Sequence, residues 1–140
     1  MPNLHSLIVH FPVALLTVAF VADFVAVVFR KEEARSVGWW VMVAGYTSLV
    51  GSVISGLLAK EVVLVPVDAG NLFERHQQAA FAAAALFSAL FLWRIGARSN
   101  IPPARFLYLF LLGVALAILW AGAWFGGRLV FQFGVGVSGV

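Results

Sequence analysis

The stretch His5-Ser6-Leu7-Ile8-Val9-His10-Phe11-Pro12-Val13-Ala14-Leu15-Leu16 places two histidines and a proline at the start of a long apolar run. Proline has no backbone N–H to donate, and its ring clashes with the carbonyl group four residues earlier, here that of Ile8. We therefore predict a helix that is kinked near His10 or begins there. Such a break frees backbone carbonyl groups and gives the His10 ring room to turn inward.

The composition of the chain is typical of a membrane protein. Of its 140 residues, 63% are hydrophobic and 11% are charged, whereas a soluble domain carries about 25% charged residues. The nine basic residues, which contribute to a net charge of +3, do not form the dense stripe expected of a nucleic-acid-binding protein. Because cysteine is absent, disulfide bonds, thiolate metal sites, iron–sulfur clusters and thioether-linked haem are excluded.

Four apolar runs are each long enough to cross a bilayer, which requires about 20 helical residues. They cover about residues 7–29, 37–58, 76–96 and 106–125, and charged or proline-containing segments separate them. Backbone groups in lipid must be hydrogen-bonded within the chain, so each run is expected to be helical. The sequence predicts a single all-α domain over residues 1–140: an integral membrane four-helix bundle with a glycine-broken tail at residues 126–140.

Positive charge is concentrated at one end of this predicted bundle. The first and third breaks, with the helix ends beside them, hold Arg30, Lys31, Arg35, Arg94, Arg98 and Arg105. The opposite end holds only Lys60, Arg75 and Arg128, offset by Glu61, Asp68 and Glu74. The positive-inside rule then predicts a multi-pass protein of the bacterial inner membrane, with both termini on the outer, periplasmic side. The expected partners are the lipid bilayer and either other membrane subunits or further copies of the chain in a homo-oligomer.

Small residues recur at helical spacing in the second apolar run. Ser48, Ser52 and Gly56 are four residues apart, as are Gly51 and Ser55. Small side chains at this spacing allow helix backbones to approach closely. We therefore expect this part of the second span to pack against another helix.

The three histidines are the main candidates for a cofactor site. His5 and His10 lie at the start of the first span and His76 opens the third, so all three are expected at the outer end. Haem b between these spans would take His10 and His76 as axial ligands, with His5 as a supporting or alternative ligand.

Other interpretations of the histidines remain open. A divalent transition metal would be bound by His10 and His76, with oxygen donors from Glu61, Asp68 or Glu74. A histidine that titrates near neutral pH would serve proton or quinol chemistry. If a histidine has no binding or chemical role, we expect it to be an interfacial side chain that is hydrogen-bonded to a lipid headgroup or a loop.

Asp23 is the carboxylate that lies well inside a predicted span, less than two turns from its cytoplasmic end. One interpretation is a structural contact, either a hydrogen bond to Tyr46, Thr47 or Ser48 or a snorkelled ion pair with Arg94. The other is a proton relay, because ionisable residues within membrane spans are often functional.

Two terminal motifs carry a resemblance to a known family. The opening Leu4 to Leu15 and the ending Gly126-Gly127, Leu129-Val130 and Gly134-Val135-Gly136-Val137 are similar to those of domain of unknown function family 2231. The members of this family are small bacterial membrane proteins. The family's third-span histidine matches His76, and the resemblance covers essentially the whole chain.

Two positions depart from the family pattern. Ser6 replaces the usual proline, and Phe133 stands where the family often has a histidine. A family site that needs four histidines would therefore be incomplete in this chain. The resemblance implies a four-span protein with outer-side histidines suited to haem or metal, and a tail that belongs to the site region, but it brings no settled activity.

The sequence contains no nucleophile elbow, phosphate loop, dinucleotide fingerprint or metalloprotease helix. A stand-alone enzyme with a soluble substrate is therefore not expected. We predict a membrane-integral haem-b-binding electron-transfer subunit with histidine ligands near the outer face. The alternative is a cofactor-free or metal-binding accessory subunit of a larger membrane complex.

Overall fold

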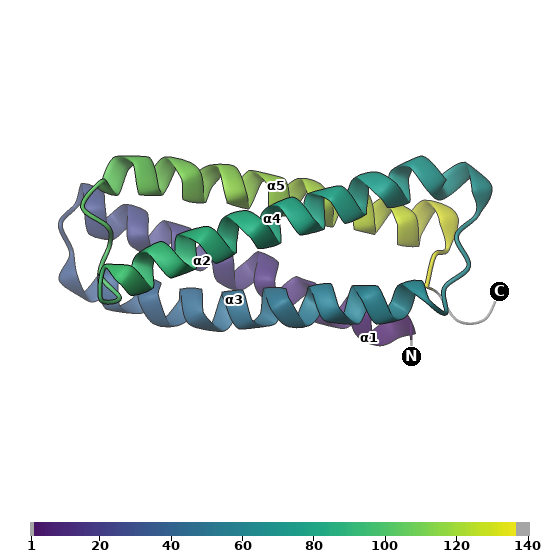
Figure 1. The fold of residues 1–140 in the computed structure, drawn as a ribbon, viewed down its shortest axis with the longest axis horizontal. Coiled ribbons are helices and arrows are strands. Elements are labelled where there is room, and N and C mark those ends of the chain that lie inside the picture. The colour runs from purple at the N-terminus through teal and green to yellow at the C-terminus, as the bar shows by residue number, and fades with distance from the viewer. Residues whose placement is uncertain (1, 137–140) are drawn as a thin grey trace.

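The computed structural model describes residues 2–136, and nearly all of them are helical (Figure 1). The elements in chain order are α1 (Pro2–Ile8), α2 (His10–Val28), α3 (Glu32–Lys60), the short 3₁₀ helix η1 (Val67–Ala69), α4 (Gly70–Gly96) and α5 (Arg105–Phe133). Four helical segments are long and apolar enough to cross a membrane, namely His5–Val28, Glu32–Lys60, Val67–Gly96 and Arg105–Phe133. The prediction of an all-α chain with four candidate spans is confirmed.

The first span is interrupted at Val9, between α1 and α2. Pro12 cannot donate to the carbonyl group of Ile8, so the helical hydrogen-bond ladder lacks one bond at this point. The chain nevertheless stays on a helical path, because Val9 has right-handed helical dihedrals and its N–H donates to the carbonyl oxygen of His5 at 3.1 Å. The predicted break near His10 is confirmed, and it is an irregularity within one span.

Three helices, α3, α4 and α5, are longer than the apolar runs indicate. α4 begins at Gly70, six residues before the predicted start at His76, because side chains at i,i+4 spacing support its polar first turns. The Nε of Arg75 donates to Asn71 at 3.0 Å, and the amide of Gln78 donates to Glu74 at 3.1 Å. The third span therefore extends beyond its apolar part.

α5 continues through the glycine pair at residues 126–127 and ends at Phe133, so the segment predicted as a broken tail is largely helical. Its end is a left-handed Gly134 with φ of 64°. There the N–H of Gly134 donates to Val130 and the N–H of Val135 donates to Leu129, both at 3.0 Å, which is the usual glycine-terminated helix end. Val137 and the three residues after it lie outside the described residues.

The helices form two antiparallel hairpins that pack into one bundle. α2 lies along α3 and α4 lies along α5, while α2 also contacts α5 and α3 contacts α4. The α2–α3 and α4–α5 turns lie at one end of the bundle (Figure 1). α1, the segment between α3 and α4, and the last turns of α5 lie at the other end. We call these the turn end and the histidine end.

Side chains from all four spans fill the core between the hairpins. Its fully buried members are Leu16, Ala19, Met42, Ala83, Phe87, Tyr108, Leu112 and Ala115. α3 approaches α2 closely at Gly45, where an added Cβ would lie 2.8 Å from Cδ2 of Leu16. The predicted small-residue contact is confirmed further along α3, where Ser52 is buried and Gly56 faces His5, although Gly51 faces open space.

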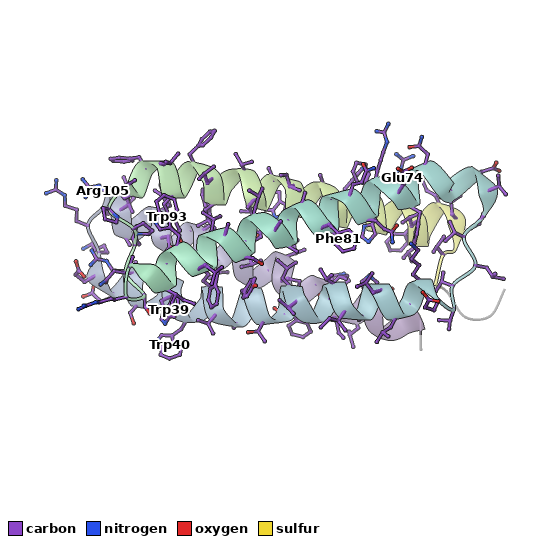
Figure 2. The ribbon with its side chains drawn as sticks, in the orientation of Figure 1. Trp39, Trp40, Glu74, Phe81, Trp93 and Arg105 are labelled. Atoms are coloured by element: carbon purple, nitrogen blue, oxygen red, sulfur yellow. The ribbon has the colours of Figure 1, made fainter. Side chains whose placement is uncertain are left out.

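The outer surface of the bundle is apolar and rich in aromatic side chains. Trp40 and Trp124 are each 67% exposed, which suits a surface that meets lipid. Figure 2 shows Trp39, Trp40 and Trp93 near the turn end, beside Arg105, with Glu74 at the opposite end. Tryptophans at this depth are typical of a membrane interface.

Candidate functional site

At the histidine end, α1 places His5 against α3. Nδ1 of His5 lies 2.9 Å from the hydroxyl oxygen of Ser55. That hydroxyl donates its own proton to the carbonyl oxygen of Ser52, also at 2.9 Å, so it accepts from Nδ1–H of His5. The resulting tautomer leaves the lone pair on Nε2 of His5 free to bind a ligand.

α4 places His76 against α5 in a matching way. Nδ1 of His76 lies 2.8 Å from the carbonyl oxygen of Gly122. A carbonyl oxygen only accepts hydrogen bonds, so Nδ1 of His76 carries a proton, and in the neutral ring the lone pair lies on Nε2. Metal-binding histidines are typically oriented in this way, by a hydrogen bond from the other ring nitrogen.

These two rings face each other across the bundle. Their centroids are 6.5 Å apart and their planes are inclined by 76°, an edge-to-face arrangement. Two imidazoles that bind one ion from opposite sides, at metal–nitrogen distances of about 2.0 Å, have ring centres roughly 6 Å apart. The separation of His5 and His76 is thus compatible with one ligand shared between the first hairpin and the second.

Two glycines leave room for the imidazole rings. A Cβ added at Gly56 would lie 3.0 Å from Cε1 of His5, and a Cβ added at Gly126 would lie 3.0 Å from Cε1 of His76. At both positions any larger residue would push against a ring. The neighbouring Gly127 has nothing within 4 Å of such an atom, so only one member of this glycine pair touches the site.

The surroundings of His10 differ from those of His5 and His76. Its side chain is exposed on the surface of the bundle, whereas His5 and His76 are both partly buried. The sequence favoured His10 with His76, and the structure instead puts His5 opposite His76. The reason is the path of α1, which carries His5 inward to Ser55 of α3.

The donor set at the histidine end consists of imidazoles alone. Among residues 2–136, no three histidine, aspartate or glutamate side chains are grouped so that they could hold a metal ion. The carboxylates considered as oxygen donors, Glu61, Asp68 and Glu74, are all exposed. Two imidazoles whose Nε2 atoms are unprotonated could serve as ligands of a haem iron, or of a copper, zinc or nickel ion.

At the turn end, α2 and α4 bring together a second polar cluster. Asp23 and Arg94 are both fully buried and form an ion pair through Oδ2 and Nη1. The hydroxyl of Tyr108 donates to the same Oδ2 at 2.9 Å, and the Met42 sulfur lies beside both donors. We call Asp23, Arg94 and Tyr108 the buried triad.

The predicted ion pair between Asp23 and Arg94 is confirmed, but both side chains are fully buried, so Arg94 does not snorkel to the interface. The hydrogen bonds offered as alternatives are wrong, because each of those side chains bonds elsewhere. The hydroxyl of Tyr46 lies 2.8 Å from that of Ser88, while Thr47 and Ser48 donate to carbonyl oxygens of their own helix. The proton-relay role of Asp23 stays a prediction. Its Oδ1 is buried and has no hydrogen-bond partner among residues 2–136.

The sequence analysis did not find Tyr108. Its position, one turn into the last span, is where interfacial tyrosines are common, and nothing in that pattern distinguishes an inward-facing ring. The sequence signal that could have found Tyr108 was the Asp–Arg pair itself. A buried Asp–Arg pair needs additional hydrogen bonds to offset desolvation, so a nearby donor was to be expected. Tyr108 supplies one of these bonds.

These features define a class of protein: a bundle of four membrane spans whose two hairpins are joined by a histidine pair at one end and a buried ion pair at the other. The chain belongs to the family described as "Predicted membrane protein (DUF2231)", whose model matches residues 1–139. The resemblance seen in the terminal motifs is therefore confirmed. No curated protein and no solved structure matches the chain.

Proposed function

We propose that this protein is a haem-b-binding electron-transfer subunit of the bacterial inner membrane, with His5 and His76 as the axial ligands. One observation carries the proposal: the two rings face each other at 6.5 Å, and each is fixed through Nδ1 with Nε2 free. Haem supplies one-electron chemistry when it is bound between two histidines. The chain's own residues orient the ligands and exclude water with apolar helix surfaces.

The loop charges support an orientation with the histidine pair at the outer face. Arg30, Lys31, Arg98 and Arg105 all belong to the turn end, where the positive-inside rule expects the cytoplasm. The proposed redox centre would then exchange electrons with a partner at the periplasmic surface. The exposed aromatic surface of the bundle is available to lipid and to other membrane subunits.

The test is a visible spectrum of the full chain, purified in mild detergent from cells supplied with haem. We expect a Soret band, with the bands of low-spin haem on reduction. His5→Ala and His76→Ala should each abolish the low-spin spectrum, and the exposed His10→Ala is the matched control that should retain it. Absence of a Soret band from the unmodified protein would sink the proposal.

The same spectra separate the two candidate ligand pairs. Loss of the low-spin bands in His10→Ala, with retention in His5→Ala, would make His10 and His76 the ligands, as the sequence analysis expected. Helix circular dichroism and size-exclusion profiles of each variant show whether it is folded. A loss of spectrum then counts only in a folded variant.

The two adjacent glycines provide a finer test of the same site. Gly126→Ala places a Cβ 3.0 Å from Cε1 of His76, whereas Gly127→Ala meets nothing within 4 Å. We expect the first substitution to shift or weaken the low-spin bands and the second to leave them unchanged. Equal spectra for the two variants would argue that ligand binding does not use His76 in this position.

The second candidate function is a metal-binding accessory subunit, which the same free Nε2 atoms favour. Two imidazoles leave positions open on a zinc or copper ion, and a partner subunit would have to fill them. Elemental analysis of the purified chain tests this function. A stoichiometric transition metal without a Soret band, lost in His5→Ala and His76→Ala, would support it over haem.

A further inference from the structure

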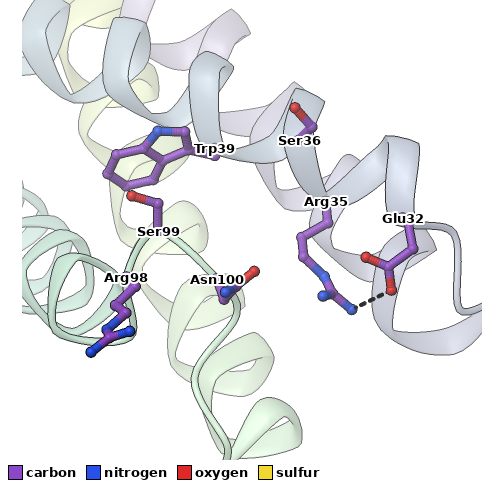
Figure 3. A pocket seen from close by; sticks show the side chains of 7 residues that line it. All are labelled: Glu32, Arg35, Ser36, Trp39, Arg98, Ser99 and Asn100. Carbon is purple, nitrogen blue, oxygen red and sulfur yellow. Dashed lines mark ion pairs between the residues drawn. The ribbon is translucent and has the colours of Figure 1, made fainter.

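A pocket of about 280 Å³ lies at the turn end, far along the bundle from the histidine pair. One wall is the first turns of α3, and the other is the turn that follows α4 (Figure 3). Its lining residues are Glu32, Arg35, Ser36, Trp39, Arg98, Ser99 and Asn100. The function proposed above makes no use of any of them.

The pocket is polar and carries a positive balance. Two arginines, one from each wall, line the pocket with a single carboxylate, that of Glu32, which lies on the same wall as Arg35. Hydroxyl and amide groups from both walls add neutral hydrogen-bond donors. Trp39 closes the inner side of the pocket with an aromatic ring. This combination is suited to an anion that lies at the membrane surface.

Arg35 is only partly satisfied by the protein. Its Nη2 pairs with Glu32 at 2.9 Å, the contact that is dashed in Figure 3. The Glu32 side chain is 73% exposed, and exposed ion pairs contribute little to stability. Nε of Arg35 is buried and has no acceptor among the described residues. An anion that replaces Glu32 would therefore give this guanidinium a better partner.

The buried triad fixes the two walls relative to each other. Nη2 of Arg94 donates to the carbonyl oxygen of Arg35 at 3.1 Å, and its Nε donates to the carbonyl oxygen of Ser99 at 3.4 Å. The same guanidinium lies 5.7 Å from the ring centre of Trp39. The Arg94 guanidinium thus contacts both walls of the pocket and Trp39, so these groups are already in place before a ligand binds.

We propose that this pocket binds a phosphate group, either that of an anionic phospholipid headgroup or free phosphate. Guanidinium groups bind phosphate oxygens with paired hydrogen bonds, and basic pockets between spans on the cytoplasmic side hold anionic headgroups. Arg35 and Arg98 supply the charge, while Ser36 and Asn100 supply neutral donors at the rim. The site is independent of the histidine pair.

The test measures thermal stability of the full chain in detergent with three additives at equal ionic strength. These are inorganic phosphate, short-chain phosphatidylglycerol and the matching zwitterionic phosphatidylcholine. A ligand that binds the folded state raises the melting temperature. We expect a rise with phosphatidylglycerol or phosphate and none with phosphatidylcholine. A response to phosphate alone identifies a free anion as the source, and a response confined to phosphatidylglycerol identifies the headgroup.

Three variants locate the effect in the pocket. Arg98→Gln should weaken the apparent affinity roughly tenfold, the usual consequence of losing a hydrogen bond to a charged group. Glu32→Gln should strengthen it, because the competing carboxylate is gone. Arg105→Gln removes an exposed arginine of the same end outside the pocket and should change it less than about twofold. No response to either anion, or equal losses in Arg98→Gln and Arg105→Gln, would overturn the proposal.

Discussion

Removing Arg94 tests how much the buried triad contributes to the bundle. Arg94→Met replaces a fully buried guanidinium by an unbranched apolar side chain of similar length. The change removes the ion pair with Asp23 and the donors to Tyr108, Arg35 and Ser99. Breaking a buried ion pair by deleting one partner costs about 3–5 kcal/mol, because the remaining charge is left unpaired. We expect the free energy of unfolding to fall by about that amount.

A double-mutant cycle separates the pair from the rest of the network. Asp23→Asn keeps the shape of the side chain and its contact with Tyr108, but it leaves Arg94 without a counter-charge. Each single substitution therefore creates one unpaired charge, and the double variant creates none. The losses should be strongly non-additive, with the double variant more stable than the sum predicts by about 2 kcal/mol or more.

The assay follows helix circular dichroism as SDS replaces a mild detergent. Arg105→Met, which removes an exposed arginine at the same end, is the control and should lie within about 0.5 kcal/mol of the unmodified chain. Losses that add to within about 0.5 kcal/mol in the double variant would refute the reasoning. Additive losses would mean that Asp23 and Arg94 contribute to stability independently, although their side chains are in contact.

Two further predictions use the same unfolding assay. Tyr108→Phe removes a neutral donor and should lower the free energy of unfolding by about 1 kcal/mol, well below the loss in Arg94→Met. An equal loss would show that the hydroxyl, and not the charge pair, supplies most of the stability of the buried triad. Gly45→Ala places a Cβ 2.8 Å from Leu16 and should destabilise the bundle by about 1–3 kcal/mol. Gly51→Ala meets no atom within 4 Å and should be neutral or stabilising; similar losses in both alanine variants would contradict the packing of α2 on α3.

The four spans could be predicted because their signal is local. Apolar runs of sufficient length, separated by charges, leave helices as the only structure that satisfies the backbone in lipid. The break near His10 was readable for the same reason, since Pro12 acts on its own helix. The pairing of Asp23 with Arg94 was also within reach, because two opposite charges near the same end of two spans have few other partners.

The helix ends could not be read from hydropathy. α4 gains its early turns from polar side chains such as Arg75 and Asn71, which a search for apolar residues passes over. α5 runs through Gly126 and Gly127 because glycine is better tolerated in membrane helices than in soluble ones. A glycine pair in a sequence suggests the end of a helix, but in the bundle Gly126 lies against the ring of His76.

The histidine pair depended on information that no single segment contains. Whether His5 or His10 faces His76 is set by the direction of α1 after the irregularity at Val9, and by the rotation of α3 that presents Ser55. The spacing of residues along the chain predicts neither the direction of α1 nor the rotation of α3. The turn-end pocket was missed for a related reason, since its two walls come from segments about 60 residues apart that only the paired hairpins bring together.

The ion pair of the buried triad also has a consequence for biogenesis. Asp23 and Arg94 are 71 residues apart, so the first hairpin enters the membrane before its counter-charge has been synthesised. An unpaired aspartate at a helix centre costs about 2.5–3.5 kcal/mol to insert, and Asp23 and Arg94, which lie nearer the ends of their spans, each carry a smaller cost of the same kind. Each hairpin thus carries one unpaired charge until the two hairpins pack together. A chain truncated after α3 would leave Asp23 without its counter-charge, so the ion pair forms only when the second hairpin has joined the first.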